Sequence, residues 1–235
     1  MKTVGLIGGM SWESTDSYYR IINEEVKERL GGLHSAKILL HSVDFEEIER
    51  FQSTGQWEKC GEILGEAARG LEMAGADFIL ICTNTMHKVA PQIASVIKIP
   101  ILHIADATAD ELDKNHIRRV GLLGTKYTLI QDFYKQRLID RGFDVLIPDM
   151  EDVDRINRII FEELCLGEIK EESRKSFQRV IEGLRERGAE AAILGCTEIG
   201  LLISQSDVSI PVFDTAVIHA KAAARLALRD ENEKV

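Results

Sequence analysis

Short apolar runs alternate along the chain with longer stretches in which apolar residues recur every three or four positions. Runs of about four to eight apolar residues, bounded by turn-forming residues, are typical of buried strands in a parallel sheet. In the first half of the chain these runs are Val4–Ile7, Ile38–Val43, Phe78–Cys82 and Ile101–Ile104. In the second half, strands are predicted near Val120–Leu123, Val145–Ile147, Ala192–Gly195 and Val212–Phe213.

The stretches between these runs follow a helical period. Two of their apolar faces consist of Tyr18, Ile21, Ile22, Val26 and Leu30, and of Ile63, Leu64, Ala67, Ala68 and Leu71. Gly75 follows the second face and is predicted to end that helix. Further helices are predicted near Asp132–Arg141, Val153–Leu164 and Ser173–Arg187. Alternating strands and helices predict a parallel sheet with helices on both of its faces.

Three segments of the first half recur in the second half, in the same order. The matching pairs are "VGLIGGMSW" with "VGLLGTKYT", "GADFILICTNT" with "GAEAAILGCTE", and "IPILHIA" with "IPVFDTA", at offsets of 116, 113 and 111 residues. We interpret the near-constant offset as an old duplication of one α/β unit. The predicted fold is therefore α/β, with two pseudo-symmetric units that each hold a parallel sheet.

The predicted domains are residues 1–98 with 210–235, and residues 99–209. Ligands of open α/β sheets bind beyond the carboxyl ends of the strands. The active site is therefore expected in the cleft between the two units.

Composition and charge exclude several classes of partner. The net charge of −10 argues against nucleic acid, because a phosphate-binding surface needs clustered Lys and Arg. No apolar run is long enough to span a membrane, and "MKTVGLIGG" meets glycine too early for a secretory signal, so a cytoplasmic protein is expected. Cys60, Cys82, Cys165 and Cys196 show neither disulfide nor zinc spacing. No nucleotide-binding glycine motif occurs, so no cofactor is expected.

The loops that follow the predicted strands carry small, hydroxyl and amide residues, with a cysteine in each half. A thiol near a helix N-terminus has a lowered pKa and can exist as a thiolate. Two acid–base groups on opposite faces of a carbon can remove a proton from one side and return one from the other. Such a pair inverts a stereocentre.

The repeat decides which residue of the first half corresponds to Cys196. Cys82 lies seven residues after Gly75 and Thr83 lies eight after it, while Cys196 lies eight residues after Gly188. Thr83 therefore corresponds to Cys196. Side chains alternate along a strand, so Cys82 is predicted to point into the core if Thr83 points to the site.

The motifs "CTNTMH", "GCTEIGLL", "GLIGGMSWEST", "HSVDFEEIE" and "FDTAVIHA" resemble the aspartate/glutamate racemases of the Asp/Glu/hydantoin racemase superfamily. These are cofactor-independent enzymes with two pseudo-symmetric α/β domains, and the resemblance covers residues 3 to 225. The family signature carries a catalytic cysteine in each half. In this chain the first of them falls on Thr83, a departure that resembles the L-aspartate/glutamate-specific subgroup with a Thr/Cys pair.

The resemblance implies an activity and a set of roles. Racemisation of aspartate and glutamate is expected, with Cys196 deprotonating the L-enantiomer, Thr83 serving the other face, and a preference for L-substrate. The implied substrate-binding residues are Met10, Gln52 (in a loop), Asn84, Thr85, Thr125, Thr197 and, for the side-chain carboxylate, Lys170. The expected partner is a small acidic amino acid. Many members of the family are dimers, so a homodimer is expected from the resemblance alone.

Two other functions fit the same pattern. One is a single-cysteine decarboxylase or isomerase of the same superfamily, and the other is a non-catalytic two-lobed protein that binds amino acids. Several polar residues also have structural interpretations: Ser11 or Ser14 as a helix cap, His87 and Lys88 as surface or capping residues, Asp214 and His219 as capping and packing residues, and the tail "RDENEKV" as a solvated end.

Overall fold

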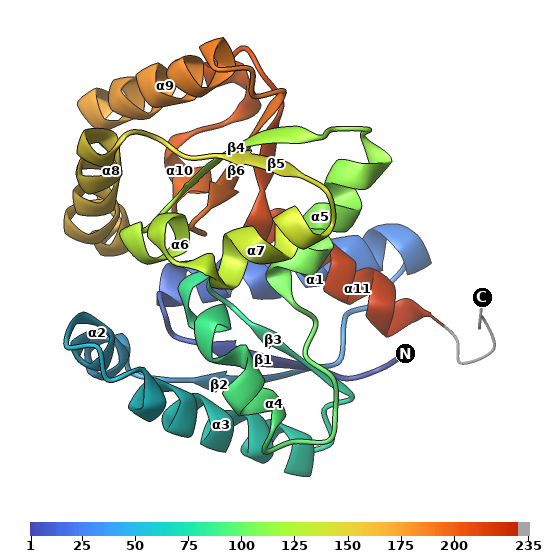
Figure 1. Cartoon of the computed structure of the whole chain (residues 1–235). Helices are drawn as coiled ribbons and strands as arrows, with labels where there is room; N and C mark the ends of the chain where they lie inside the picture. Colours follow the sequence, from blue (N-terminus) through green and yellow to red (C-terminus); the bar gives the residue numbers. More distant parts are fainter. Residues whose placement is uncertain (230–235) are drawn as a thin grey trace. The chain divides into compact units, whose positions relative to one another are not determined.

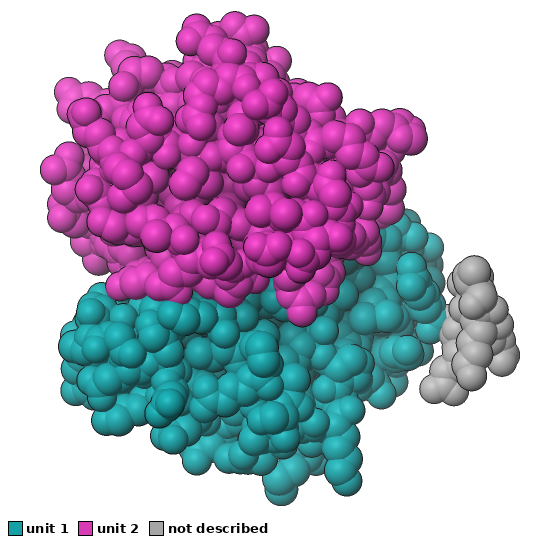
Figure 2. Space-filling view, viewed as in Figure 1, with its two compact units in different colours: residues 1–104, 219–235 teal, residues 105–218 magenta. Residues whose placement is uncertain are grey.

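Parallel strand pairs form both sheets of the computed structural model, which describes residues 1–229. The chain divides into unit 1, Met1–Ile104 with the segment from His219 onward, and unit 2, Ala105–Ile218 (Figure 2). The α/β prediction is confirmed. The predicted solvated tail beyond Arg229 lies outside the described residues.

Unit 1 holds a three-stranded sheet of order β2-β1-β3 (Figure 1). Its elements are β1 (Val4–Gly8), α1 (Trp12–Leu30), β2 (Ile38–Ser42), α2 (Phe45–Ser53), α3 (Trp57–Met73), β3 (Phe78–Ile81), the 3-10 helix η1 (Thr85–Val89) and α4 (Ala90–Ala94), to which α11 (Thr215–Leu228) adds its residues from His219. Helix α3 lies along one face of this sheet, where Leu64 and Ala68 pack against Ile79 and Ile81.

Unit 2 holds a four-stranded parallel sheet of order β5-β4-β6-β7. Its elements are α5 (Ile104–Lys114), β4 (Arg119–Gly124), α6 (Lys126–Ile130), α7 (Asp132–Asp140), β5 (Asp144–Leu146), α8 (Met150–Glu162), η2 (Leu164–Leu166), α9 (Glu171–Glu186), β6 (Ala191–Gly195), α10 (Ile199–Leu202), η3 (Gln205–Asp207) and β7 (Val212–Asp214). Helices α8 and α9 contribute Ile160 and Phe177 to a core shared with Leu194 of β6.

The two sheets repeat one strand order, which agrees with the interpretation of a duplication. In each, the first strand of the copy is central, the second lies on one side and the third on the other. Gly75 and Gly188 occupy equivalent positions after α3 and α9, with φ of 95° and 96°. This left-handed conformation favours glycine and ends both helices before the next strand.

The predicted strand Ile101–Ile104 is wrong. Ile101 forms only an isolated parallel bridge with Ile79. Two hydrogen bonds make this bridge, from the Ile79 N–H to the Pro100 carbonyl and from the Leu102 N–H to the Ile79 carbonyl, each at 2.9 Å, and α5 begins at Ile104. In unit 2 the equivalent segment does form a strand, because β7 pairs with β6 over three residues.

The unit boundaries also differ from the predicted domains. Residues 210–218 were predicted to join the first domain, but β7 pairs with β6 and so lies in unit 2. The first boundary falls after Ile104, where α5 begins, instead of after residue 98. The repeat, in which "IPVFDTA" of the second half corresponds to "IPILHIA" of the first, agrees with the place of this strand in unit 2.

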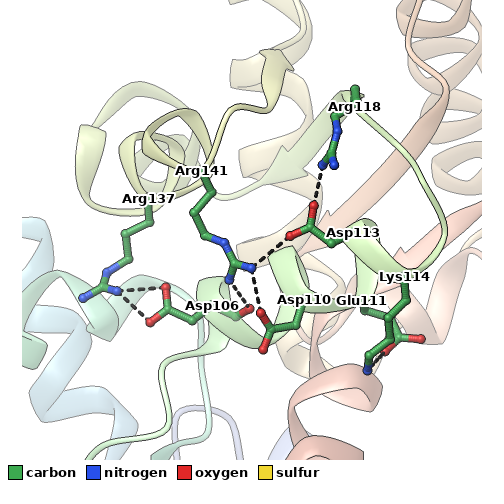
Figure 3. Close-up of polar contacts among 8 residues, drawn as sticks. All are labelled: Asp106, Asp110, Glu111, Asp113, Lys114, Arg118, Arg137 and Arg141. Carbon is green, nitrogen blue, oxygen red and sulfur yellow. Dashed lines mark hydrogen bonds and ion pairs between the residues drawn. The ribbon is translucent and has the colours of Figure 1, made fainter.

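Ion pairs join the polar face of α5 to the elements that follow it in unit 2 (Figure 3). Arg137 of α7 pairs with Asp106 at 2.7 Å, and Arg141 reaches Asp110 at 2.7 Å and Asp113 at 3.0 Å. Arg118 also pairs with Asp113, and these two arginines hold the pKa of the Asp113 carboxyl below its ordinary value. Exposed pairs of this kind stabilise weakly.

No helix within residues 1–229 is both long and apolar enough to cross a membrane.

Candidate active site

The first turn of α1 follows β1 and reaches the end of β3. Ser11 caps α1 by accepting a hydrogen bond from the Ser14 N–H, as predicted for this loop. Thr15 Oγ1 accepts from the Gly9 N–H at 2.9 Å, which joins the loop to the helix. The Ser14 hydroxyl donates to the carbonyl of Cys82 at 3.4 Å. The loop after β1 and the loop after β3 are therefore linked within unit 1.

Cys82 and Thr83 differ sharply in their surroundings. Cys82 is 0% exposed, which confirms that it is a core residue. Burial raises the pKa of its thiol far above the ordinary value, so it stays protonated. Thr83, one residue further on, is half-buried. Only the second of these side chains is open enough to meet a ligand.

His87 is buried rather than on the surface, contrary to one of the two roles predicted for it. Its Nε2 accepts the Ile104 N–H at 3.2 Å, at the first residue of α5. Nδ1 therefore carries the ring proton and donates to the carbonyl of Thr83 at 2.8 Å. Burial, with His103 and His219 nearby, holds the pKa of His87 well below its ordinary value, so the ring is neutral.

His219 packs beneath the same strand ends in unit 1, as predicted. Its Nε2–H donates to the carbonyl of Leu102 at 2.7 Å, and its Nδ1 accepts from the Tyr18 hydroxyl at 2.9 Å. The side chain is fully buried, and burial lowers its pKa to about 4.

This histidine makes the stability of the protein depend on pH. The unfolded chain binds the His219 proton near pH 6.5 and the folded chain near pH 4, so the stability is present above pH 6.5 and is lost as the pH falls to 4. We expect roughly 3 kcal/mol of unfolding free energy to be lost over this window. Urea unfolding of the parent and of His219→Gln at several pH values measures it. Equal pH slopes in the two proteins would contradict the assignment.

The remaining predicted residues of unit 1 are all buried. Met10 packs in the unit 1 core with Ile48. Gln52 lies in helix α2, so its predicted place in a loop is wrong. The apolar face of "FEEIERF" extends the helix through Gln52 because Gly55 is the first residue able to end it. Asn84 and Thr85 stand where β3 passes into η1.

Cys196 follows β6 in unit 2 and donates a hydrogen bond to a carboxylate. Its Sγ lies 2.9 Å from Glu198 Oε2, and the Thr197 hydroxyl donates to the same oxygen at 2.8 Å. Cys196 is 7% exposed and Glu198 3%. A buried carboxylate that accepts both hydrogen bonds forms a compact acid–base group with the thiol at the end of the strand.

The lowered pKa predicted for a thiol near a helix N-terminus is not found at Cys196. Burial and the negative charge of Glu198 raise the pKa of the Cys196 thiol well above its ordinary value. The following helix, α10, has only four residues, so its dipole is too small to offset these effects. The thiol therefore holds its proton until a group such as Glu198 removes it.

The contacts of Glu198 and His87 were not predicted from the sequence. Glu198 stands in the quoted motif "GCTE", two residues after the cysteine, and that spacing was the available signal. His87 lies four residues after Thr83, the spacing of a side chain that reaches back to a carbonyl.

Three other predicted residues of unit 2 have defined partners. Thr125 caps α6 and lies 3.2 Å from the Thr128 hydroxyl. Lys170 forms ion pairs with Glu168 at 2.8 Å and with Glu163 at 3.7 Å, so its charge is balanced by neighbouring glutamates. Asp214 caps α11 by accepting the N–H groups of Ala216 and Val217, as predicted.

Each unit, taken by itself, carries a side chain that can exchange a proton. Unit 1 presents a hydroxyl at Thr83, and unit 2 presents a thiol paired with a carboxylate. Among residues 1–229, no group of three or more His, Cys, Asp and Glu side chains is arranged to hold a metal ion.

Residues 7–223 match the family model described as Asp/Glu/Hydantoin racemase. The chain belongs to this family. Its members are amino-acid racemases, so the predictions of family and of enzyme class, an isomerase, are confirmed. The family does not favour the alternatives of a decarboxylase or a binding protein.

Solved structures of racemase relatives resemble the whole chain. A Yersinia pestis protein assigned to the Asp/Glu racemases is 55% identical, with a TM-score of 0.91, covering 97% of this chain and 100% of its own. An aspartate racemase homologue from Pyrococcus horikoshii is 41% identical, with a TM-score of 0.85 and the same coverage. The aspartate racemase of Picrophilus torridus is 27% identical, with a TM-score of 0.77, covering 97% of this chain and 94% of its own.

Proposed function

We propose that this racemase interconverts the enantiomers of aspartate, and of glutamate, by proton transfer at Cα, with a preference for the L-enantiomer. The observation that carries the proposal is the Cys196 thiol bonded to the buried carboxylate of Glu198, with a hydroxyl, Thr83, at the equivalent position of unit 1. The names of two relatives, an aspartate racemase and an aspartate racemase homologue, support the substrate class.

In the proposed reaction, Glu198 accepts the thiol proton and the Cys196 thiolate removes the Cα proton of the L-amino acid. The electron pair of the broken C–H bond stays on the substrate, delocalised into its α-carboxylate. The Thr83 hydroxyl then gives a proton to the opposite face and is reprotonated by water. Glu198 returns its proton to solvent, so one proton leaves Cα and one arrives.

The unlike groups explain the expected preference. A hydroxyl is a far weaker acid than a thiol and a poor base without activation, so removal of a proton by Thr83 from the D-enantiomer is the slow direction. Asn84, Thr85 and Thr197 are proposed to contact the α-carboxylate and the amine, with Met10, Gln52 and Thr125 lining the site. The homodimer and the cytoplasmic location stay predictions; light scattering of the purified protein tests the first.

A circular-dichroism assay with both enantiomers of aspartate and glutamate tests the proposed function, together with deuterium incorporation at Cα in D₂O. A racemase exchanges the Cα proton of L-aspartate and forms D-aspartate without loss of carbon. Release of carbon dioxide, or binding without exchange, would refute it.

Glu198→Gln is expected to lower kcat for L-aspartate by about 10²-fold, with little change in KM. Glutamine keeps the size and one hydrogen-bonding oxygen but cannot accept the thiol proton. The remaining activity is expected to rise with pH, because hydroxide must then remove that proton. A pH–rate profile of parent and variant measures both effects. Unchanged kcat would show that Glu198 does not act as the proton acceptor.

A further inference from the structure

The peptide groups on both sides of Thr83 are held by hydrogen bonds within unit 1. On the preceding side, the Cys82 N–H donates to the carbonyl of Ile7 at 2.9 Å, and the Cys82 carbonyl accepts from Ser14. On the following side, the Thr83 carbonyl accepts the Nδ1–H of His87 at 2.8 Å. Because both flanking peptides are restrained, the direction of the Thr83 side chain is set by groups other than its own hydroxyl.

The His87 ring that bonds to Thr83 is itself held in place by other groups of unit 1. The Ile104 N–H occupies Nε2, so the ring cannot rotate without losing one of its two bonds. The His103 ring lies 4.4 Å away and the His219 ring 5.8 Å away, each edge to face. The groups facing His87 are thus two further histidines and backbone, and its low pKa keeps the ring neutral. The Ile104 N–H at Nε2 leaves the single ring proton on Nδ1.

We propose that His87 is a positioning residue for Thr83: its Nδ1–H holds the Thr83 carbonyl and thereby aims the hydroxyl at the reacting carbon. His87 does not touch the substrate. This inference rests on the proposed function and extends it from Thr83 to His87, which bonds to the Thr83 carbonyl.

A misdirected Thr83 has a distinctive kinetic effect. The carbanion formed by Cys196 has two fates: it takes a proton from Thr83, which inverts the centre, or a hydrogen from Cys196, which does not. In D₂O the thiol hydrogen exchanges with solvent through Glu198, so its return leaves deuterium in L-aspartate. Slower proton donation by Thr83 favours the return of a proton by Cys196. In D₂O the ratio of deuterium in recovered L-aspartate to D-aspartate formed therefore rises, whereas a general loss of folded protein lowers both products together.

Two substitutions at His87 separate its two hydrogen bonds. Asparagine places an N–H donor where Nδ1 stands, so His87→Asn keeps the bond to Thr83 and loses the acceptor for Ile104. Glutamine places an acceptor near the position of Nε2, so His87→Gln keeps the Ile104 bond and loses the donor to Thr83. His219→Gln, which alters the same cluster without touching Thr83, is the matched control.

The experiment measures the return-to-inversion ratio with L-aspartate in D₂O for the parent and the three variants. We expect His87→Gln to raise the ratio about tenfold, and His87→Asn and His219→Gln to stay within about twofold of the parent. A normal ratio in His87→Gln, or an equal rise in His219→Gln, overturns the proposal. If the parent itself exchanges no Cα proton, the proposed function fails instead, which keeps the two outcomes distinct.

A second measurement needs no stable variant. Long-range ¹H–¹⁵N spectra of the labelled parent report the tautomer of each buried histidine. A neutral His87 ring with its proton on Nδ1 supports the proposal. A proton on Nε2 overturns it, because that ring cannot donate to Thr83.

Discussion

Replacing Cys196 by alanine is expected to lower kcat/KM for L-aspartate by about 10³-fold, equivalent to about 4 kcal/mol of transition-state stabilisation. The variant keeps Thr83 but lacks the group proposed to remove the L-proton, and Glu198 loses the thiol that is hydrogen-bonded to it. Deuterium incorporation into L-aspartate is expected to vanish along with racemisation. Loss of inversion alone, with exchange retained, would place the L-side base elsewhere.

Cys82→Ala is the matched control for this experiment. Cys82 is fully buried at the end of β3, so its loss removes a core sulfur and leaves the surface that meets the ligand unchanged. We expect a decrease of about 1 kcal/mol in stability and activity within about threefold of the parent. A Cys82→Ala enzyme as inactive as Cys196→Ala would contradict the assignment that the repeat makes.

Cys196→Ser separates acidity from shape at the same position. Serine keeps a hydrogen-bond donor for Glu198 but is a much weaker acid, so its activity is expected to stay near that of the alanine variant. Activity close to the parent would mean that the thiol is dispensable and that the site tolerates a hydroxyl on both faces.

The fold was largely predictable because the internal repeat is visible in the amino-acid sequence. Gly75 and Gly188 end equivalent helices, and the apolar runs after them form the equivalent strands β3 and β6. The segment Ile101–Ile104 could not be predicted in the same way. Both this segment and its counterpart Val212–Asp214 follow a proline and precede a helix that begins four residues after that proline, so their sequence context does not show which of them pairs over three residues.

The positions in the candidate site were more predictable than its protonation states. Counting from the glycines separates Thr83 from Cys82, and the burial of Cys82 agrees with it. The pKa of Cys196 is raised, not lowered, because a sequence shows that a helix follows the thiol but does not show its desolvation or the orientation of Glu198 toward the sulfur. The restraint of Thr83 by His87 likewise depends on a ring orientation that Ile104 fixes.

Removal of the Thr83 hydroxyl is the second substitution expected to change activity strongly, because the proposed difference between the two enantiomers depends on this hydroxyl. Thr83→Val keeps the branched shape and removes the hydroxyl, and we expect it to lower D-aspartate formation from L-aspartate by about 10²-fold. Exchange of the L-substrate in D₂O is expected to persist, since Cys196 and Glu198 are untouched. Thr83→Ser, which retains the hydroxyl, is the control and is expected to keep most of the inversion.

Thr83→Cys tests the same residue in the opposite direction. A thiol ionises far more readily than a hydroxyl, so this variant is expected to raise the rate with D-aspartate by at least about tenfold and to weaken the preference for the L-enantiomer. Thr83 is half-buried, so the new thiol is less desolvated than Cys82 and keeps a lower pKa than that core thiol. Initial rates with both enantiomers, followed by circular dichroism, measure the change. A variant that gains nothing with D-aspartate while keeping its rate with L-aspartate would show that the acidity of residue 83 does not set the preference.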